Sequence, residues 1–161
     1  MPKKTFNEKL NFRGDLPKVA QITEPWKIER YKATTMLIAA PLEYDALMKK
    51  VPRGKLTTID RMMAHLAKQH GAGCACPMTA GMFVNIAAHA SEERFGQDRF
   101  GKNETPWWRT LKKDGQLNEK FPDGIEGQKA RLEAEGHTVV QKGKRYLVEG
   151  YEGKVVNFKF T

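Results

Sequence analysis

Two segments of helical periodicity, separated by a glycine-rich stretch, constrain the fold of this chain most strongly. The first predicts a helix over residues 58–70 and the second a helix over residues 78–90. The apolar positions of the first are Ile59, Met62, Met63, Leu66 and Ala67, and those of the second are Met82, Phe83, Ile86, Ala87 and Ala90. Gly71 ends the first helix and Pro77 opens the second. The order helix, turn, helix is typical of a helix-turn-helix unit.

Local signals before and after this unit predict further short elements. Residues 41–50 form a short helix with proline in its first turn. Thr57 or Thr58 can cap the next helix, in a pattern resembling a capping box with Asp60. Residues 1–40 have no clean period and are expected as an extended arm with short elements.

The second half of the chain predicts a loop, a helix and strands. Residues 91–104 are expected as a charged loop, followed by a turn at Asp114-Gly115. Asp123 can cap a helix over residues 124–135, which Gly136 ends. The expected strands are a hairpin of residues 138–141 with 145–149, and a last strand over residues 155–160.

The charge balance points to nucleic acid. Among 161 residues there are 28 Lys and Arg against 19 Asp and Glu, which gives a net charge of +9. Such an excess often accompanies a nucleic-acid partner. The length predicts one domain, and no stretch is long and apolar enough for a membrane span. The first ten residues have no apolar segment of the kind found in secretory signals, so we expect a cytoplasmic protein.

Two cysteines and two histidines are candidate metal ligands. Cys74 and Cys76 follow His65 and His70, and four such ligands would satisfy a tetrahedral zinc site. The Cys-x-Cys spacing differs from the usual Cys-x-x-Cys, and the two histidines lie on different faces of a helix. We therefore expect no metal and no cofactor, and we interpret both cysteines as small apolar side chains.

Two blocks together resemble one family. Residues 51–67 read VPRGKLTTIDRMMAHLA, and residues 105–136 contain Pro-Trp-Trp-Arg, a glycine turn and a segment that ends in Glu-Gly. This order resembles the DNA-binding domain of the alkylguanine-DNA alkyltransferases and their alkyltransferase-like relatives. The blocks of that family are Pro-x-Gly-Lys-Val-Thr-Thr-Tyr followed by a helix, and Pro-Cys-His-Arg followed by a glycine turn and a helix.

The resemblance covers residues 41–138 and implies a winged helix-turn-helix DNA-binding domain. Together with an N-terminal arm of residues 1–40 and a C-terminal β-hairpin extension of residues 139–161, it predicts an α+β fold. In that family the second helix of the unit enters the minor groove, and a flipped base lies in a pocket beside a reactive cysteine. Flipping serves the chemistry because the alkylated oxygen is out of reach inside the base stack.

The chain departs from the family where the chemistry takes place. Trp107 stands at the position of the acceptor cysteine and Trp108 at that of the histidine. Alkyl transfer needs an activated nucleophile, and an indole ring is not one. Glu135 matches the glutamate that orients the missing histidine. Because tryptophan at the cysteine position also occurs in alkyltransferase-like proteins, which bind alkylated guanine without repairing it, the resemblance implies no catalytic residue.

The candidate base pocket has two interpretations. The resemblance places Trp107, Trp108, Phe121 and Glu135 around it. In the first interpretation the two indole rings form a wall against which an extruded base stacks. In the second, at least one ring fills the vacated pocket as part of the hydrophobic core.

Candidate DNA contacts come from three places along the chain. They are Lys55, Thr57 and Thr58 before the first helix, Met78, Thr79 and Asn85 on the second, and Arg109, Lys112 and Lys113 after the tryptophans. Hydroxyl groups at a helix start suit a phosphate, although capping alone would also explain them. Met78 falls near the arginine that replaces the flipped base in the family, and an apolar side chain can wedge into a base stack.

These observations predict a non-enzymatic protein that binds double-stranded DNA and recognises alkylated guanine or the duplex alone. DNA repair proteins are further candidate partners, and no membrane partner is expected. One alternative is an active alkyltransferase with a relocated acceptor, Cys74 or Cys76. Another is a protein-interaction module on the same fold.

Overall fold

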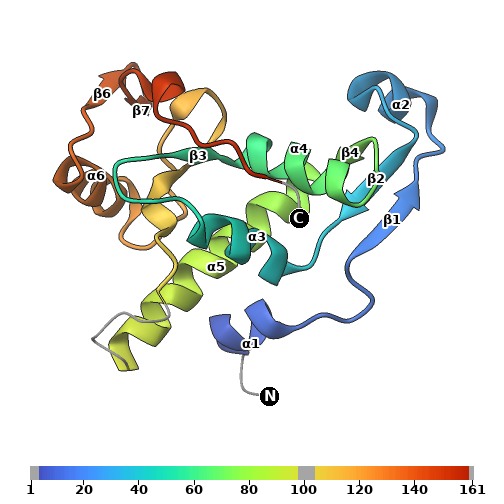
Figure 1. Cartoon of the computed structure of the whole chain (residues 1–161), viewed down its shortest axis with the longest axis horizontal. Helices are drawn as coiled ribbons and strands as arrows, with labels where there is room; N and C mark the ends of the chain where they lie inside the picture. Colours follow the sequence, from blue (N-terminus) through green and yellow to red (C-terminus); the bar gives the residue numbers. More distant parts are fainter. Residues whose placement is uncertain (1–3, 98–103, 160–161) are drawn as a thin grey trace.

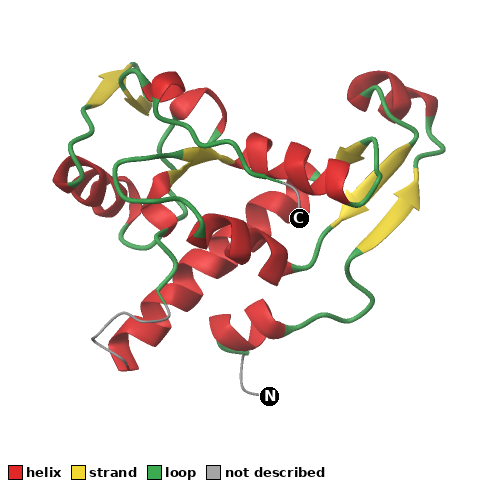
Figure 2. Cartoon of the chain, viewed as in Figure 1, coloured by secondary structure: helices red, strands yellow, loops and turns green. Residues whose placement is uncertain are grey.

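A computed structural model describes residues 4–97 and 104–159, which form a mixed α+β structure (Figures 1 and 2). The helices are α1 (Phe6–Asn11), α2 (Pro25–Tyr31), α3 (Pro41–Lys49), α4 (Ile59–Gln69), α5 (Pro77–Gln97) and α6 (Gly124–Ala134). The strands are β1 (Lys18–Gln21), β2 (Thr35–Ile38), β3 (Thr57–Thr58), β4 (Cys74–Ala75), β5 (Thr110–Leu111), β6 (Val139–Lys142) and β7 (Arg145–Val148). Short 3-10 turns are η1 (Trp107–Arg109), η2 (Lys113–Gly115) and η3 (Tyr151–Gly153). The α+β class predicted from the sequence is confirmed.

The long helix α5 crosses the middle of the molecule, with α1, α3 and α4 packed against it (Figure 1). The helix expected over residues 58–70 is confirmed as α4, whose buried face carries Met62, Leu66 and Ala67. The Thr58 hydroxyl accepts the Arg61 N–H at 3.4 Å. Thr58 is therefore the N-cap, and the box with Asp60 is not formed. Within the described residues, no helix has the length and apolar character to cross a membrane.

Helix α5 is longer than expected, and one side chain expected on its buried face is exposed. It continues to Gln97, so residues 91–97 of the expected loop are helical, whereas residues 98–103 lie outside the described part of the chain. Segments distant in sequence provide hydrogen-bond partners for the polar side chains of residues 91–97. The Glu93 carboxylate accepts the backbone N–H of Phe6 at 2.9 Å. The Ser91 hydroxyl accepts the backbone N–H of Thr105 at 2.9 Å. The expectation that Met82 is buried is wrong, because its side chain is 53% exposed.

The first described residues build part of a sheet. Strand β2 lies between β1, to which it pairs antiparallel, and β4, to which it pairs parallel. Because β4 lies between α4 and α5, this sheet joins the N-terminal segment to the connection between these two helices. The four residues of β1 are all exposed, and α2 lies at the end of the molecule beyond the sheet (Figure 1).

The C-terminal hairpin is confirmed as β6 and β7, with Val139 opposite Val148. The expected strand over residues 155–160 is wrong for its described part. A single bridge joins Val155 to Leu56, after which the ring of Phe158 packs against the ring of His65 at 5.4 Å. Asp123 occupies the N-cap position of α6, but its backbone is left-handed and its side chain makes no capping hydrogen bond.

The turn at Asp114-Gly115 is confirmed and requires glycine at its second position. Gly115 has a φ of +81°, and a Cβ built there would lie 2.4 Å from the ring of Tyr151. We expect Gly115→Ala to lower the free energy of unfolding by about 1–3 kcal/mol, because it adds backbone strain to this clash. Denaturant unfolding measures the change. Gly153→Ala is the matched control, since a Cβ at Gly153 meets nothing within 4 Å; equal effects of the two variants would refute the steric explanation.

Candidate nucleic-acid interface

Trp107 is a residue of the hydrophobic core. Its side chain is fully buried in the turn η1. Its ring meets those of Trp108 and Phe121 edge-on, with centroids 5.6 Å and 5.5 Å away. The indole Nε1–H donates to the Glu92 carboxylate at 3.0 Å. The ring of Trp107 is buried and its N–H already has a partner, so it packs as part of the hydrophobic core. This arrangement agrees with the second interpretation, in which the ring fills the predicted base pocket.

Trp108 and Arg109 share one buried carboxylate. The indole Nε1–H of Trp108 donates to Glu135 Oε2 at 2.8 Å. Arg109 donates to both oxygens of Glu135, with Nη2–Oε2 at 2.8 Å, and also to the carbonyl of Val51 at 2.8 Å. Burial alone would raise the pKa of Glu135, but the hydrogen bonds from Arg109 and Trp108 and the charge of Arg109 hold it below its usual value. Arg109 is therefore held within the structure, with 14% of its side chain exposed.

Two residues that the sequence analysis missed complete this network. The guanidinium of Arg131 lies 4.8 Å from the ring centroid of Trp107 and pairs with Glu92 at 3.5 Å. Arg131 comes from α6, whereas Glu92 lies in the part of α5 that was expected as a loop. Because these groups meet only in the tertiary structure, no local pattern indicated them.

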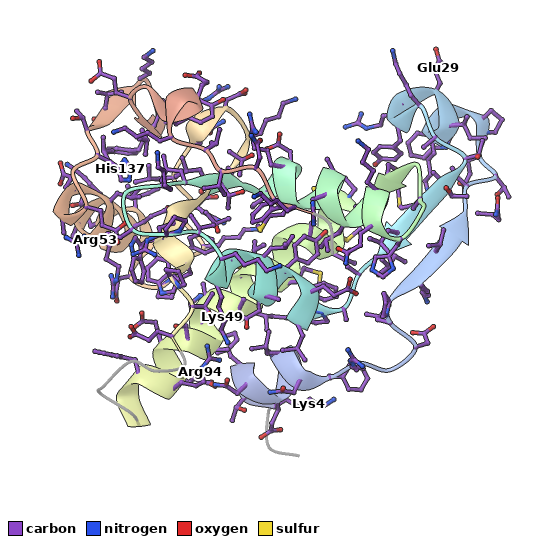
Figure 3. The ribbon with its side chains drawn as sticks, in the orientation of Figure 1. Lys4, Glu29, Lys49, Arg53, Arg94 and His137 are labelled. Carbon is purple, nitrogen blue, oxygen red and sulfur yellow. The ribbon has the colours of Figure 1, made fainter. Side chains whose placement is uncertain are left out.

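Residues at and just after the end of α6 lie near the network around Glu135. Arg53, labelled in Figure 3, donates to the carbonyl of Ala134 at 3.2 Å. His137 is buried, its Nδ1 lies 3.4 Å from the Lys154 ammonium, and its Nε2 has no hydrogen-bond partner among the described residues. Burial and then the charge of Lys154 lower the pKa of His137. His137 is therefore a neutral core histidine at neutral pH.

A groove of about 400 Å³ runs beside the first turns of α5. It is lined by Ile59, Pro77, Met78, Gly81, Met82, Asn85, Lys112, Asn118, Glu119 and Lys120. Three predicted DNA contacts meet here, namely Met78, Asn85 and Lys112. Met78 is 74% exposed, and Asn85 Oδ1 is buried without a hydrogen-bond partner in the described structure. The groove thus combines exposed apolar side chains with the cations Lys112 and Lys120 and the carboxylate of Glu119, which pairs with Lys112.

The other predicted contacts lie outside this groove. Thr57 is fully buried and Thr58 caps α4. The Thr79 hydroxyl donates to the carbonyl of Cys76 at 3.3 Å. Lys55 and Lys113 are exposed.

The candidate metal ligands His65, His70, Cys74 and Cys76 do not form a metal-binding cluster in the described structure. Burial raises the pKa of the Cys74 thiol, whose Sγ lies 3.5 Å from the carbonyl oxygen of Thr35. His70 instead contacts the Glu43 carboxylate at 2.5 Å. No group of three or more His, Cys, Asp or Glu that could hold a metal ion occurs among residues 4–97 and 104–159. Cys74 lines a separate cavity of about 470 Å³ together with Tyr31.

Comparison with known proteins gives a structural likeness only. No protein-family model matches the chain, and no curated protein matches it by sequence. A structure of S. pombe ATL in complex with DNA matches 73% of this chain and 94% of that chain, at 18% identity and a TM-score of 0.52. A structure of S. pombe Atl1 in complex with damaged DNA containing O6-carboxymethylguanine matches with the same identity and coverage at a TM-score of 0.49. At this identity the likeness defines the fold, and the resemblance to alkyltransferase-like proteins predicted from residues 51–67 and 105–136 is confirmed at that level.

Proposed function

We propose that this chain is a non-enzymatic protein that binds duplex DNA, recognising alkylated guanine or the duplex alone without methyl transfer. The observation that carries the non-enzymatic part is Trp107, an indole at the acceptor position, and the fold shared with an S. pombe protein bound to DNA supports the DNA-binding part. Binding without transfer follows, because this position offers no nucleophile.

The arrangement of helices supports α5 as the helix presented to DNA. Helices α4 and α5 with β4 between them form the helix-turn-helix unit, and residues 41–138 form the winged-helix domain of the proposal. Residues 1–40 are its N-terminal arm and residues 139–161 its C-terminal extension. The net charge of +9 supports a polyanionic partner.

The groove beside α5 supplies the contacts. Met78 and Met82 are exposed at consecutive turns of α5, and apolar side chains of this kind insert between base steps in minor-groove binders. Lys112 and Lys113 bind phosphates, which adds affinity without reading sequence. Among the predicted pocket residues, Trp108 is half-buried, whereas Trp107 and Phe121 are buried, with the Trp107 ring in contact with both other rings.

Fluorescence anisotropy with two matched duplexes tests the proposal. One duplex carries a single O6-methylguanine and the other an unmodified guanine, and both are titrated at two salt concentrations. A preference of at least tenfold for the methylated duplex, about 1.4 kcal/mol, would support recognition of the alkylated base. Equal affinities that fall steeply with salt would refute lesion recognition and leave a general duplex binder. Weak binding that vanishes near physiological salt would favour the protein-interaction module instead.

The same methylated duplex, labelled on the methyl group, separates binding from catalysis. No label is expected on the protein at concentrations that saturate the duplex, because Trp107 offers no nucleophile at the acceptor position. Burial also raises the pKa of the Cys74 thiol, which disfavours the nucleophilic thiolate there. Label on the protein that is lost in Cys74→Ser or Cys76→Ser would overturn the non-enzymatic assignment.

A further inference from the structure

The hairpin of β6 and β7 ends in an exposed cationic tip that the proposed function does not use. Lys142, Lys144 and Arg145 lie within four residues, with the tight turn at Gly143 between them. All three cations are exposed, and the segment from residue 138 to 148 contains no acidic residue. A surface with this density of one charge attracts polyanions.

The base of the hairpin is anchored, whereas its tip projects from the molecule. Val148 is buried in a second hydrophobic cluster with Leu117 and Leu132, and Val139 and Tyr146 pack against the same cluster. The two strands are paired over four residues each, up to the tip. The cations are therefore carried on a supported arm at one end of the molecule (Figure 1).

The hairpin is joined to the wall of the groove by backbone hydrogen bonding. Gln116 bridges Leu147 antiparallel, and the Leu117 N–H donates to the carbonyl of Tyr146 at 2.8 Å. Asn118, the next residue along the chain, lines the groove. The hairpin is therefore anchored beside the segment that supplies part of the groove wall.

The surrounding acidic groups leave the tip cations available. Glu149 follows β7, Asp114 lies on η2, and Glu119 pairs with Lys112 at 3.4 Å. Within the described residues no ion pair joins any carboxylate to Lys142, Lys144 or Arg145, since the pairs found there involve other cations.

We propose that this hairpin tip is a second DNA-contacting element, which binds backbone phosphates beyond the groove beside α5. The inference rests on the proposed function and enlarges the surface that contacts DNA. Two ammonium groups and one guanidinium suit phosphodiester oxygens, with Arg145 able to bind two oxygens of one phosphate. Such contacts raise affinity on any sequence and leave discrimination between bases to the groove.

The salt dependence of DNA binding tests the hairpin. In the full chain, Lys142→Ala, Lys144→Ala and Arg145→Ala are combined, and the affinity for the unmodified duplex is measured by anisotropy over a series of salt concentrations. Each phosphate contact contributes about 0.9 to the slope of log K against log salt. We expect the combined variant to flatten this slope by about 2–3, with an unchanged preference for the methylated duplex.

A second combined variant with the same charge change serves as the control. Lys4→Ala, Lys9→Ala and Arg13→Ala also remove two lysines and one arginine, around α1 on a different side of the molecule (Figure 1). We expect this variant to retain the wild-type slope. Circular dichroism confirms that both variants are folded.

The outcomes separate the two proposals. A wild-type chain that binds neither duplex would refute the proposed function itself. Wild-type binding with an unchanged slope in the hairpin variant would refute the hairpin contact alone. Equal flattening in both variants would indicate a general charge effect, which also overturns the hairpin contact.

Discussion

Trp107→Ala is expected to lower the free energy of unfolding by about 3–5 kcal/mol, the range for a large aromatic side chain removed from a core. The ring is fully buried, packs against Trp108 and Phe121, and lies beneath the guanidinium of Arg131. Its loss leaves a cavity and also leaves Glu92 without the indole donor. Chemical denaturation followed by circular dichroism measures the change.

Trp26→Ala is the matched control for this substitution, because the Trp26 side chain is 61% exposed. We expect this control to change stability by less than about 0.5 kcal/mol. A similarly small change for Trp107→Ala would mean that the ring is not needed for packing. It would then support the alternative in which both tryptophans form an open wall for a base.

Glu135→Ala is expected to cost about 3–5 kcal/mol, because removing one partner of a buried ion pair leaves the other charge uncompensated. The Glu135 side chain is 5% exposed, and it receives hydrogen bonds from Arg109, Trp108 and the backbone of Gly54. Without Glu135, the Arg109 guanidinium has no carboxylate partner and the indole N–H of Trp108 has no acceptor. The measurement is again the free energy of unfolding at neutral pH.

Glu119→Ala tests whether burial of the ion pair causes the large expected loss of stability in Glu135→Ala. Glu119 also forms an ion pair, with Lys112, but 58% of its side chain is exposed. An exposed pair of this kind contributes about 0–1 kcal/mol. Losses of equal size for Glu119→Ala and Glu135→Ala would contradict the role assigned to the buried network.

The same carboxylate predicts a pH dependence in the wild-type chain. The pKa of Glu135 in the folded state lies below its ordinary value of 4.5. A lowered pKa means that the unfolded chain binds protons more readily, so this contribution to stability is complete above pH 4.5 and is lost as the pH falls through the folded pKa. In Glu135→Gln the acid decline should be shallower, which urea unfolding between pH 3 and pH 7 would measure.

The fold was predictable where the pattern is local. The stripe from Met62 to Ala67 and the positive φ of Gly71 define α4 and its end, because amphipathic periodicity and a glycine stop act within a few residues. The alternation on both sides of Gly143 defines the hairpin for the same reason. In contrast, the continuation of α5 to Gln97 depends on α1 and Thr105, which satisfy its polar side chains from distant parts of the chain.

The candidate site divides in a similar way. The resemblance in sequence placed Trp107, Trp108, Phe121 and Glu135 in one region, and the structure brings them together. It did not indicate that Glu135 would bind Arg109, because bidentate pairing depends on how α6 meets η1. Exposed Met82 was also missed, since a 3.6-residue period does not tell which side of a helix is covered when several apolar positions compete.

The sequence by itself determined the order of the helices from α3 to α6, the hairpin, the excess of positive charge and the absence of a nucleophile at position 107. These properties depend on residue identity and on contacts a few residues apart. Only the tertiary structure decided that Trp107 is buried, that Glu135 holds Arg109, and that β7 bridges Gln116 through Leu147. Burial and ion pairing depend on which surfaces meet, and those surfaces come from segments that the chain brings together only when it folds.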